Sequence, residues 1–255
     1  MNVSLKYLVI LFLITFSVYS INRLSDPQED QINRPEALSF TQRNKKIFLF
    51  FIIVSYCVAF LLAFLDDIWT ALFVIFPLGV VLLYGIGVSS ENTQRMRVKQ
   101  IFLVKNLIVS FTWATMVIML PILYSKDDLT TVAGILYSYI FIQIFIDCVA
   151  TDIKDIVGDK KAQIKTIPSL YGEKKTLILL QVITLASVVF FGIVSYFYFS
   201  NMIFLTYTIL SGVITILYLK YYQTTLKNTI VDVVVDGRNI ICGLVLVGLL
   251  YLGFL

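Results

Sequence analysis

The sequence predicts an all-α membrane protein, a polytopic bundle of about eight transmembrane helices that forms a single domain over residues 1–255. Two observations predict this class. Hydrophobic residues make up 59% of the chain and charged residues only 14%, which is too little polar surface for a soluble domain of this length. Apolar segments also recur along the whole chain, each with about the 20 residues that a helix needs to cross a bilayer.

The apolar segments predict eight membrane-spanning helices. They cover residues 4–21, 47–65, 68–89, 106–124, 130–151, 176–199, 201–219 and 239–255. Asp66-Asp67 and Phe199-Ser200-Asn201 are such short interruptions that the spans on either side of each are predicted to form hairpins. We favour a retained first helix over a cleaved signal peptide, because no small-residue cleavage site follows residues 4–20.

Four of the remaining connections are long and polar, and they fix the predicted orientation. They are residues 22–46, 90–105, 152–175 and 220–238. They carry 5, 4, 6 and 3 Lys or Arg residues, so 18 of the chain's 20, whereas the opposite side holds only Lys6 and Lys126. By the positive-inside rule these connections are cytoplasmic and both termini lie outside, in a cell membrane.

The chain has no histidine, which excludes a histidine general base, a His-Asp triad and a mixed His/Cys zinc site. Its three cysteines, Cys57, Cys148 and Cys242, are far apart and lie in or beside apolar segments. We interpret them as reduced packing residues. Besides the lipid bilayer, we expect no nucleic-acid partner and no obligate protein partner.

Two clusters of polar residues stand out because charges are scarce in this chain. Each follows a long apolar helix, each has a spacing that places its members on one face of a helix, and both fall on the predicted cytoplasmic side. Their members are Asn22, Asp26 and Asp30 in the first cluster and Asp152, Asp155 and Asp159 in the second. An offset of four helices between the clusters preserves orientation, which predicts two parallel, pseudo-repeated halves.

Carboxylates on one helical face repel one another unless a cation lies among them. A solvated acidic surface is the general alternative, and the neighbouring lysines are one source of positive charge. A divalent metal is another. Oxygen ligands without His or Cys favour Mg²⁺, which proteins hold with a few carboxylates and substrate phosphates. Nearby cations for phosphate oxygens are Arg34, Lys105 and Lys165. With the apolar bundle, these residues indicate chemistry on a lipid phosphate or diphosphate.

Both clusters resemble the aspartate-rich motifs of the UbiA superfamily of intramembrane prenyltransferases. Residues Asn22–Pro35 read N-x₃-D-x₃-D and end in D-Q-I-N-R-P, similar to the family's D-x-I-N-R-P. Residues Asp152–Pro168 read D-x₂-D-x₃-D and continue into a segment similar to the family's G-D-x₃-G-I-K-T-x-P. The chain departs from the pattern at Gln163, where Gly is usual, and at Glu36, where Arg is common. The resemblance extends in order over nearly the whole chain.

The resemblance implies Mg²⁺-dependent transfer of a prenyl group from a polyprenyl diphosphate to an aromatic or other lipophilic acceptor within the membrane. It implies that the aspartates are catalytic because, with Asn22, they hold the metal that stabilises the leaving diphosphate. The implied metal ligands are Asn22, Asp26, Asp30, Asp152, Asp155 and Asp159. The implied substrate-binding residues are Asn22, Arg34, Lys105 and Lys165, with Arg95 and Lys99 as further candidates. Superfamily acceptors include quinone-ring, haem and chlorophyll precursors and glycerol phosphate lipids.

Family members usually have nine helices, with the first motif after the second helix, whereas this chain places it after the first. We therefore expect one leading helix to be absent, through a misplaced start or in a shortened variant. The alternative function is a catalytically impaired paralogue, or a lipid- or ion-binding membrane protein without transferase activity. A CDP-alcohol phosphatidyltransferase is rejected because Asp236-Gly237-Arg238-Asn239 lacks that family's Ala-Arg and follows the acidic motifs.

Four further charged residues lie near the cytoplasmic ends of predicted spans. Asp147 has two equally weighted interpretations, an intramembrane functional acid or a side chain that reaches the membrane interface. For Asp232, Asp236 and Arg238 we favour a solvated loop before the last helix, with a role in lining the site as the alternative.

Overall fold

The fold is described by a computed structural model, which covers residues 5–25, 27–85, 87–88, 96–199, 202–222 and 229–251. These residues are almost wholly helical, and their strands are two short antiparallel partners, β1 (Gly87–Val88) and β2 (Met96–Arg97). The chain divides into two compact units. Unit 1 comprises Met1–Phe141 and Asp155–Thr166, and unit 2 comprises Ile142–Lys154 and Ile167–Leu255.

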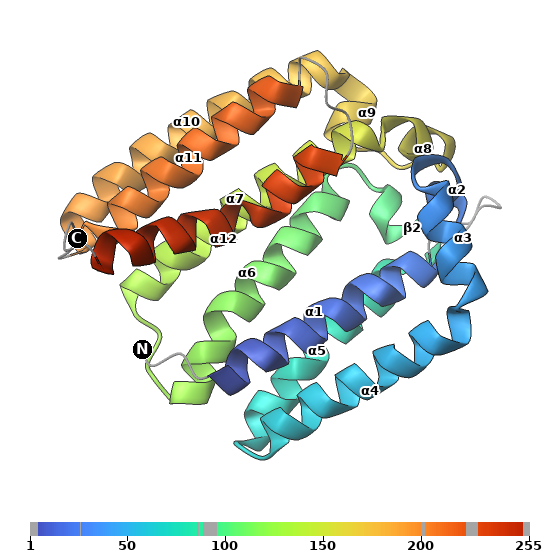
Figure 1. Cartoon of the computed structure of the whole chain (residues 1–255), viewed down its shortest axis with the longest axis horizontal. Helices are drawn as coiled ribbons and strands as arrows, with labels where there is room; N and C mark the ends of the chain where they lie inside the picture. The colour runs from blue at the N-terminus through green and yellow to red at the C-terminus, as the bar shows by residue number, and fades with distance from the viewer. Residues whose placement is uncertain are drawn as a thin grey trace. The chain divides into compact units, whose positions relative to one another are not determined.

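Long helices occupy all eight predicted spans (Figure 1). They are α1 (Leu5–Ser25), α4 (Lys45–Phe64), α5 (Ile68–Gly85), α6 (Val104–Ser125), α7 (Thr131–Lys154), α10 (Glu173–Tyr198), α11 (Ile203–Tyr222) and α12 (Thr229–Tyr251). In the described part of the chain, six of them are long and apolar enough to cross a membrane, and α5 and α12 have shorter apolar stretches. The prediction of an all-α, multi-pass membrane protein is therefore confirmed.

The order of elements is repeated along the chain, as the predicted pseudo-repeat requires. Two short helices, α2 (Pro27–Asn33) and α3 (Pro35–Arg43), separate α1 from α4. Two others, α8 (Ile156–Lys161) and α9 (Ile167–Tyr171), separate α7 from α10. In each half the next two long helices, α4 and α5 or α10 and α11, follow with few residues between them. The acidic clusters thus lie at equivalent places, where a long helix gives way to short ones.

The second acidic cluster does not lie on one uninterrupted helix, so the prediction that its members share a single helical face is wrong. The first cluster includes Asp26, between α1 and α2, which lies outside the described residues. In the second cluster α7 ends at Lys154, Asp155 forms a turn and α8 begins at Ile156. Aspartate is a weak helix former, which makes it a tolerable residue for such a break.

Unit 1 has its core where α1 packs against α4, α5 and α6. Ala59, Ala63 and Ala71 are fully buried, and such small side chains let the helices approach closely. The Tyr7 hydroxyl joins α1 to α6 by donating to the Val117 carbonyl oxygen over 3.2 Å. On the outer side of α4, Phe50 and other large apolar side chains are exposed, as expected of residues that face lipid.

Unit 2 is built from α10, α11 and α12 with the C-terminal part of α7. Gly212 allows a close approach of α11 to α10, because a Cβ at this position would overlap the Val188 side chain. Thr208 and Thr215 are fully buried, and each hydroxyl donates to the carbonyl oxygen four residues earlier, which satisfies it within α11.

Candidate functional site

Two short helices, each carrying the last aspartate of one acidic motif, lie side by side in unit 1. Helix α2, which contains Asp30, packs against α8, which contains Asp159. The contact runs through Asn33 and Gly158, because the Gly158 N–H donates a hydrogen bond to Asn33 Oδ1 over 3.2 Å. A Cβ on Gly158 would overlap the end of the Asn33 side chain, so a larger residue here would displace Asn33 from this contact.

Asn33 and Gly158 form a contact between the two motifs that their sequence pattern had not indicated. Both stand inside the quoted motifs, in D-Q-I-N-R-P and in the G-D pair before Ile-Lys-Thr. The motifs therefore contained both residues, but we predicted binding roles only for the charged residues and Asn22. The structure adds that an uncharged pair joins the two motifs.

Two further contacts hold α8 in unit 1. Lys105, on the first turn of α6, places its Nζ atom 3.5 Å from Asp159 Oδ2. Gln100, in the 3₁₀ turn η1 (Val98–Gln100), donates from Nε2 to the Ala162 carbonyl oxygen over 2.9 Å. The Asp159 side chain is only 3% exposed, so its carboxylate is fixed in a buried position beside a cation. Helix α8 is thus held by α2, by η1 and by α6.

The chain leaves α8 through a left-handed residue. Gln163 has φ +58°, in the region that glycine adopts with least strain, and the Gln163 N–H donates to the Lys160 carbonyl oxygen over 3.2 Å. This geometry explains why the family pattern has Gly at this position. The following Ile164 N–H donates back to the Asp159 carbonyl oxygen over 2.8 Å, which closes the turn.

The other predicted site residues are distributed over both units. In unit 1, Asn22 lies on the last turns of α1, Arg34 joins α2 to α3, and Asp30, Arg34 and Asp155 are half-buried. Lys165 is exposed, whereas Lys99 in η1 is only 3% exposed. In unit 2, Asp152 lies on the last turn of α7 and is only 3% exposed. Asp26 and Arg95 lie outside the described residues.

Among the described side chains, no three His, Cys, Asp or Glu residues are grouped closely enough to hold a metal ion by themselves. The metal-ligand assignment therefore stays a prediction. The donor chemistry fits Mg²⁺, because the acidic side chains of α2, Asp155 and α8 offer oxygen atoms and the chain has no histidine. Mg²⁺ ordinarily completes its shell with water and substrate phosphates, so a small number of carboxylates suits it.

An apolar cavity of about 70 Å³ lies between α1, α5 and α6 of unit 1. Its wall includes Val18, Val80 and Ile108, with Asn22 among the few polar residues. Tyr19 and Trp113 also line it, and their rings stack with centroids 5.7 Å apart and planes 5° from parallel. A predicted substrate-binding residue thus borders a hydrophobic space.

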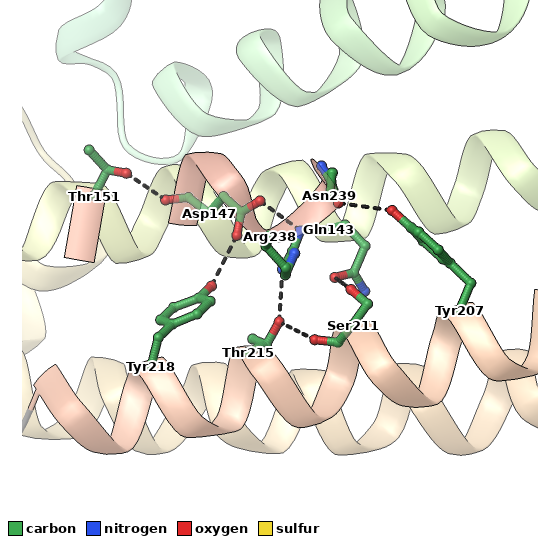
Figure 2. Close-up of polar contacts among 9 residues, drawn as sticks. All are labelled: Gln143, Asp147, Thr151, Tyr207, Ser211, Thr215, Tyr218, Arg238 and Asn239. Atoms are coloured by element: carbon green, nitrogen blue, oxygen red, sulfur yellow. Dashed lines mark hydrogen bonds and ion pairs between the residues drawn. The ribbon is translucent and has the colours of Figure 1, made fainter. Parts of the chain in front are cut away.

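Unit 2 contains a buried polar network that joins α7, α11 and α12 (Figure 2). Arg238 Nη2 lies 2.7 Å from Asp147 Oδ2, Arg238 Nη1 donates to Thr215 Oγ1 over 2.8 Å, and the Tyr218 hydroxyl donates to Asp147 Oδ1 over 3.0 Å. One turn earlier on α7 and on α11, the Ser211 hydroxyl donates to Gln143 Oε1 over 3.4 Å. Asp147 is therefore a paired acid within a helical bundle.

The interpretation of Arg238 as part of a solvated loop is wrong. Helix α12 begins at Thr229 rather than at residue 239, so Arg238 lies inside the helix and is fully buried. The guanidinium is tolerated there because Asp147 compensates its charge. The side chains of Asp232 and Asp236 lie outside the described residues.

Known proteins of the same architecture support the motif resemblance. The model of the UbiA prenyltransferase family matches residues 3–232. A UbiA homolog from Aeropyrum pernix K1, solved in its apo form, has a TM-score of 0.69 at 15% identity, over 94% of this chain and 90% of that chain. A search of curated proteins finds no match.

A UbiA homolog from Archaeoglobus fulgidus was solved in two complexes. Bound to DMAPP and Mg²⁺, it has a TM-score of 0.61 at 16% identity; bound to GPP and Mg²⁺, it has a TM-score of 0.62 at 17% identity. Each comparison covers 96% of this chain and 87% of that chain. Because the family model spans most of the sequence, this multi-pass protein belongs to the UbiA prenyltransferase family.

Proposed function

We propose that this prenyltransferase moves a prenyl group from a prenyl diphosphate to a lipophilic acceptor within the membrane, in a Mg²⁺-dependent reaction. The observation that carries the proposal is the contact between α2 and α8, which joins the segments of both acidic motifs in one unit. The A. fulgidus homolog bound to DMAPP or GPP with Mg²⁺ supports the same class of substrate and metal.

The proposed roles follow the chemistry of the side chains. Asp26, Asp30, Asp152, Asp155 and Asp159 would hold Mg²⁺ with help from the Asn22 amide oxygen. When bound, Mg²⁺ neutralises charge on the departing diphosphate and so assists cleavage of the allylic C–O bond. The cations that would bind diphosphate oxygens are Arg34, Lys105 and Lys165. Their positive charge keeps the leaving group in place while the acceptor attacks.

The apolar cavity beside Asn22 is the proposed place for the prenyl chain. Its wall is mostly apolar, as the walls of small-molecule pockets usually are. The aromatic rings of Tyr19 and Trp113 line it, and aromatic faces stabilise neighbouring positive charge such as an allylic cation. A lipophilic acceptor suits the same environment, because such a molecule reaches the site from the bilayer.

Replacing Asp155 by Ala is expected to lower prenyl transfer by about 10- to 100-fold, as removal of one member of a metal-binding set does. The measurement is incorporation of radiolabelled prenyl groups in membranes supplied with Mg²⁺. Asp128→Ala is the matched control, since it removes an exposed carboxylate from the turn between α6 and α7. Equal transfer by Asp155→Ala and the unmodified protein would refute the catalytic assignment.

We also propose that the acidic motifs face the cytoplasm, which the clustering of Lys and Arg on the same connections supports. The test uses a background in which Cys57, Cys148 and Cys242 are replaced by Ser. A membrane-impermeant maleimide added to intact cells is expected to label Asp128→Cys and to leave Lys161→Cys unlabelled, both positions being exposed. The reverse pattern would invert the proposed orientation.

A further inference from the structure

The ion pair between Lys105 and Asp159 joins two residues to which the proposed function gives different partners. Asp159 is proposed to bind Mg²⁺ and Lys105 to bind diphosphate, yet Lys105 Nζ lies 3.5 Å from Asp159 Oδ2. A carboxylate that is 3% exposed is stable as an anion only beside a compensating charge. Lys105 supplies such a charge in the structure.

The two members of this pair differ in how firmly they are held. The backbone of Asp159 is fixed on both sides, because its N–H donates to the Asp155 carbonyl oxygen and its carbonyl oxygen accepts from Ile164, each over 2.8 Å. Its neighbour Gly158 is held by Asn33. Lys105 has a flexible four-carbon stem and is 22% exposed. Any rearrangement of the pair therefore moves the lysine and leaves the carboxylate in place.

We propose that Lys105 is the resident counter-ion of Asp159, and that it leaves this carboxylate for the diphosphate when substrate and Mg²⁺ bind together. The inference rests on the proposed function and deepens it. When no diphosphate is present, Lys105 competes with the metal ion for the Asp159 carboxylate. With diphosphate present, the same ammonium group gains phosphate oxygens as new partners and no longer opposes the metal. Lys105 thus makes binding of metal and diphosphate mutually dependent.

This mechanism predicts effects of opposite sign from one substitution. Lys105→Gln is expected to bind the metal alone about 5- to 10-fold more tightly than the unmodified protein, because the competing cation is gone. The same variant is expected to bind inorganic diphosphate with Mg²⁺ about 10-fold more weakly, because one phosphate contact is lost. Loss of fold would weaken both affinities and cannot produce this pattern. A general loss of positive charge is tested with a second lysine.

The experiment uses the purified full chain in nanodiscs. Mn²⁺ serves as the metal probe, read by electron paramagnetic resonance without diphosphate, and inorganic diphosphate with Mg²⁺ is read by calorimetry. Lys161→Gln removes the same charge from an exposed position of α8 and is expected to leave both affinities unchanged. Lys105→Arg keeps a cation in place and is expected to bind Mn²⁺ no more tightly than the unmodified protein.

The outcomes separate the two proposals. Mn²⁺ binding to Lys105→Gln that is unchanged or weaker overturns the counter-ion role of Lys105 while the proposed function stands. An unmodified protein that binds neither Mn²⁺ nor diphosphate with Mg²⁺ contradicts the proposed function itself, and the inference with it. Tighter Mn²⁺ binding together with weaker diphosphate binding supports both.

Discussion

Replacing Asp147 by Asn is expected to destabilise the protein by about 3–5 kcal/mol, the usual cost of breaking one side of a buried ion pair. The reason is Arg238, which is fully buried and cannot lose its proton. In the native protein the Asp147 carboxylate lies 2.7 Å from the guanidinium. The amide of Asn can accept a hydrogen bond but cannot compensate the charge.

This prediction is checked by thermal unfolding in detergent, with the double variant Asp147→Leu/Arg238→Met beside the single one. Removing both charges leaves no uncompensated ion, so the double variant is expected to recover most of the lost stability. Tyr218→Phe is the milder control, because it removes one hydrogen bond and is expected to cost about 1 kcal/mol. An Asp147→Asn variant as stable as Tyr218→Phe would show that the charge of Asp147 is dispensable.

Replacing Gly158 by Ala is expected to reduce prenyl transfer by about 100-fold, since displacements near 1 Å at a catalytic site have effects of that size. The added Cβ overlaps the Asn33 side chain, so Asn33 must turn away and lose its hydrogen bond to Gly158, or α2 and α8 must separate. Such overpacking also costs about 1–3 kcal/mol of stability. Asp159, the next residue, would move with the backbone of Gly158.

The comparison that isolates this effect uses other glycine and asparagine substitutions. Gly134→Ala adds the same methyl group where nothing lies within 4 Å, and it is expected to keep full transfer. Asn33→Gly/Gly158→Ala removes the overlap but also the hydrogen bond, so transfer is expected to recover in part. If Gly158→Ala retains the transfer rate of Gly134→Ala, the contact between α2 and α8 does not position the site.

The long helices could be predicted from the sequence because hydrophobicity over about 20 residues determines membrane spans almost independently of tertiary structure. The ends of these helices could not. Arg238 is buried inside α12, and Asp147, far away in the sequence, neutralises its charge there. Hydropathy averages over a window and contains no information about a charge partner on another helix. The pairing is visible only in three dimensions.

For the acidic motifs too, the sequence predicted one feature correctly and another wrongly. Their spacing singled out two polar segments, and α2 packs on α8, but it predicted an unbroken helix through the second motif. The turn at Asp155 has no marker in the sequence as plain as a proline. Gln163 is the converse case. The glycine that the family pattern has at this position indicates a left-handed backbone. In this chain, contacts around Gln163 must hold a residue with a side chain in that conformation.

Trp113, which stacks on Tyr19, is an intrinsic fluorescence probe of the cavity. The chain has only two tryptophans, and the other, Trp69, is 69% exposed at the start of α5. Trp69→Phe would therefore leave a single emitting indole in the wall of the cavity beside Asn22. Its emission wavelength depends on how much water surrounds the ring. Occupancy of the cavity by an unlabelled lipid chain can thus be followed by fluorescence, in real time and without a reaction.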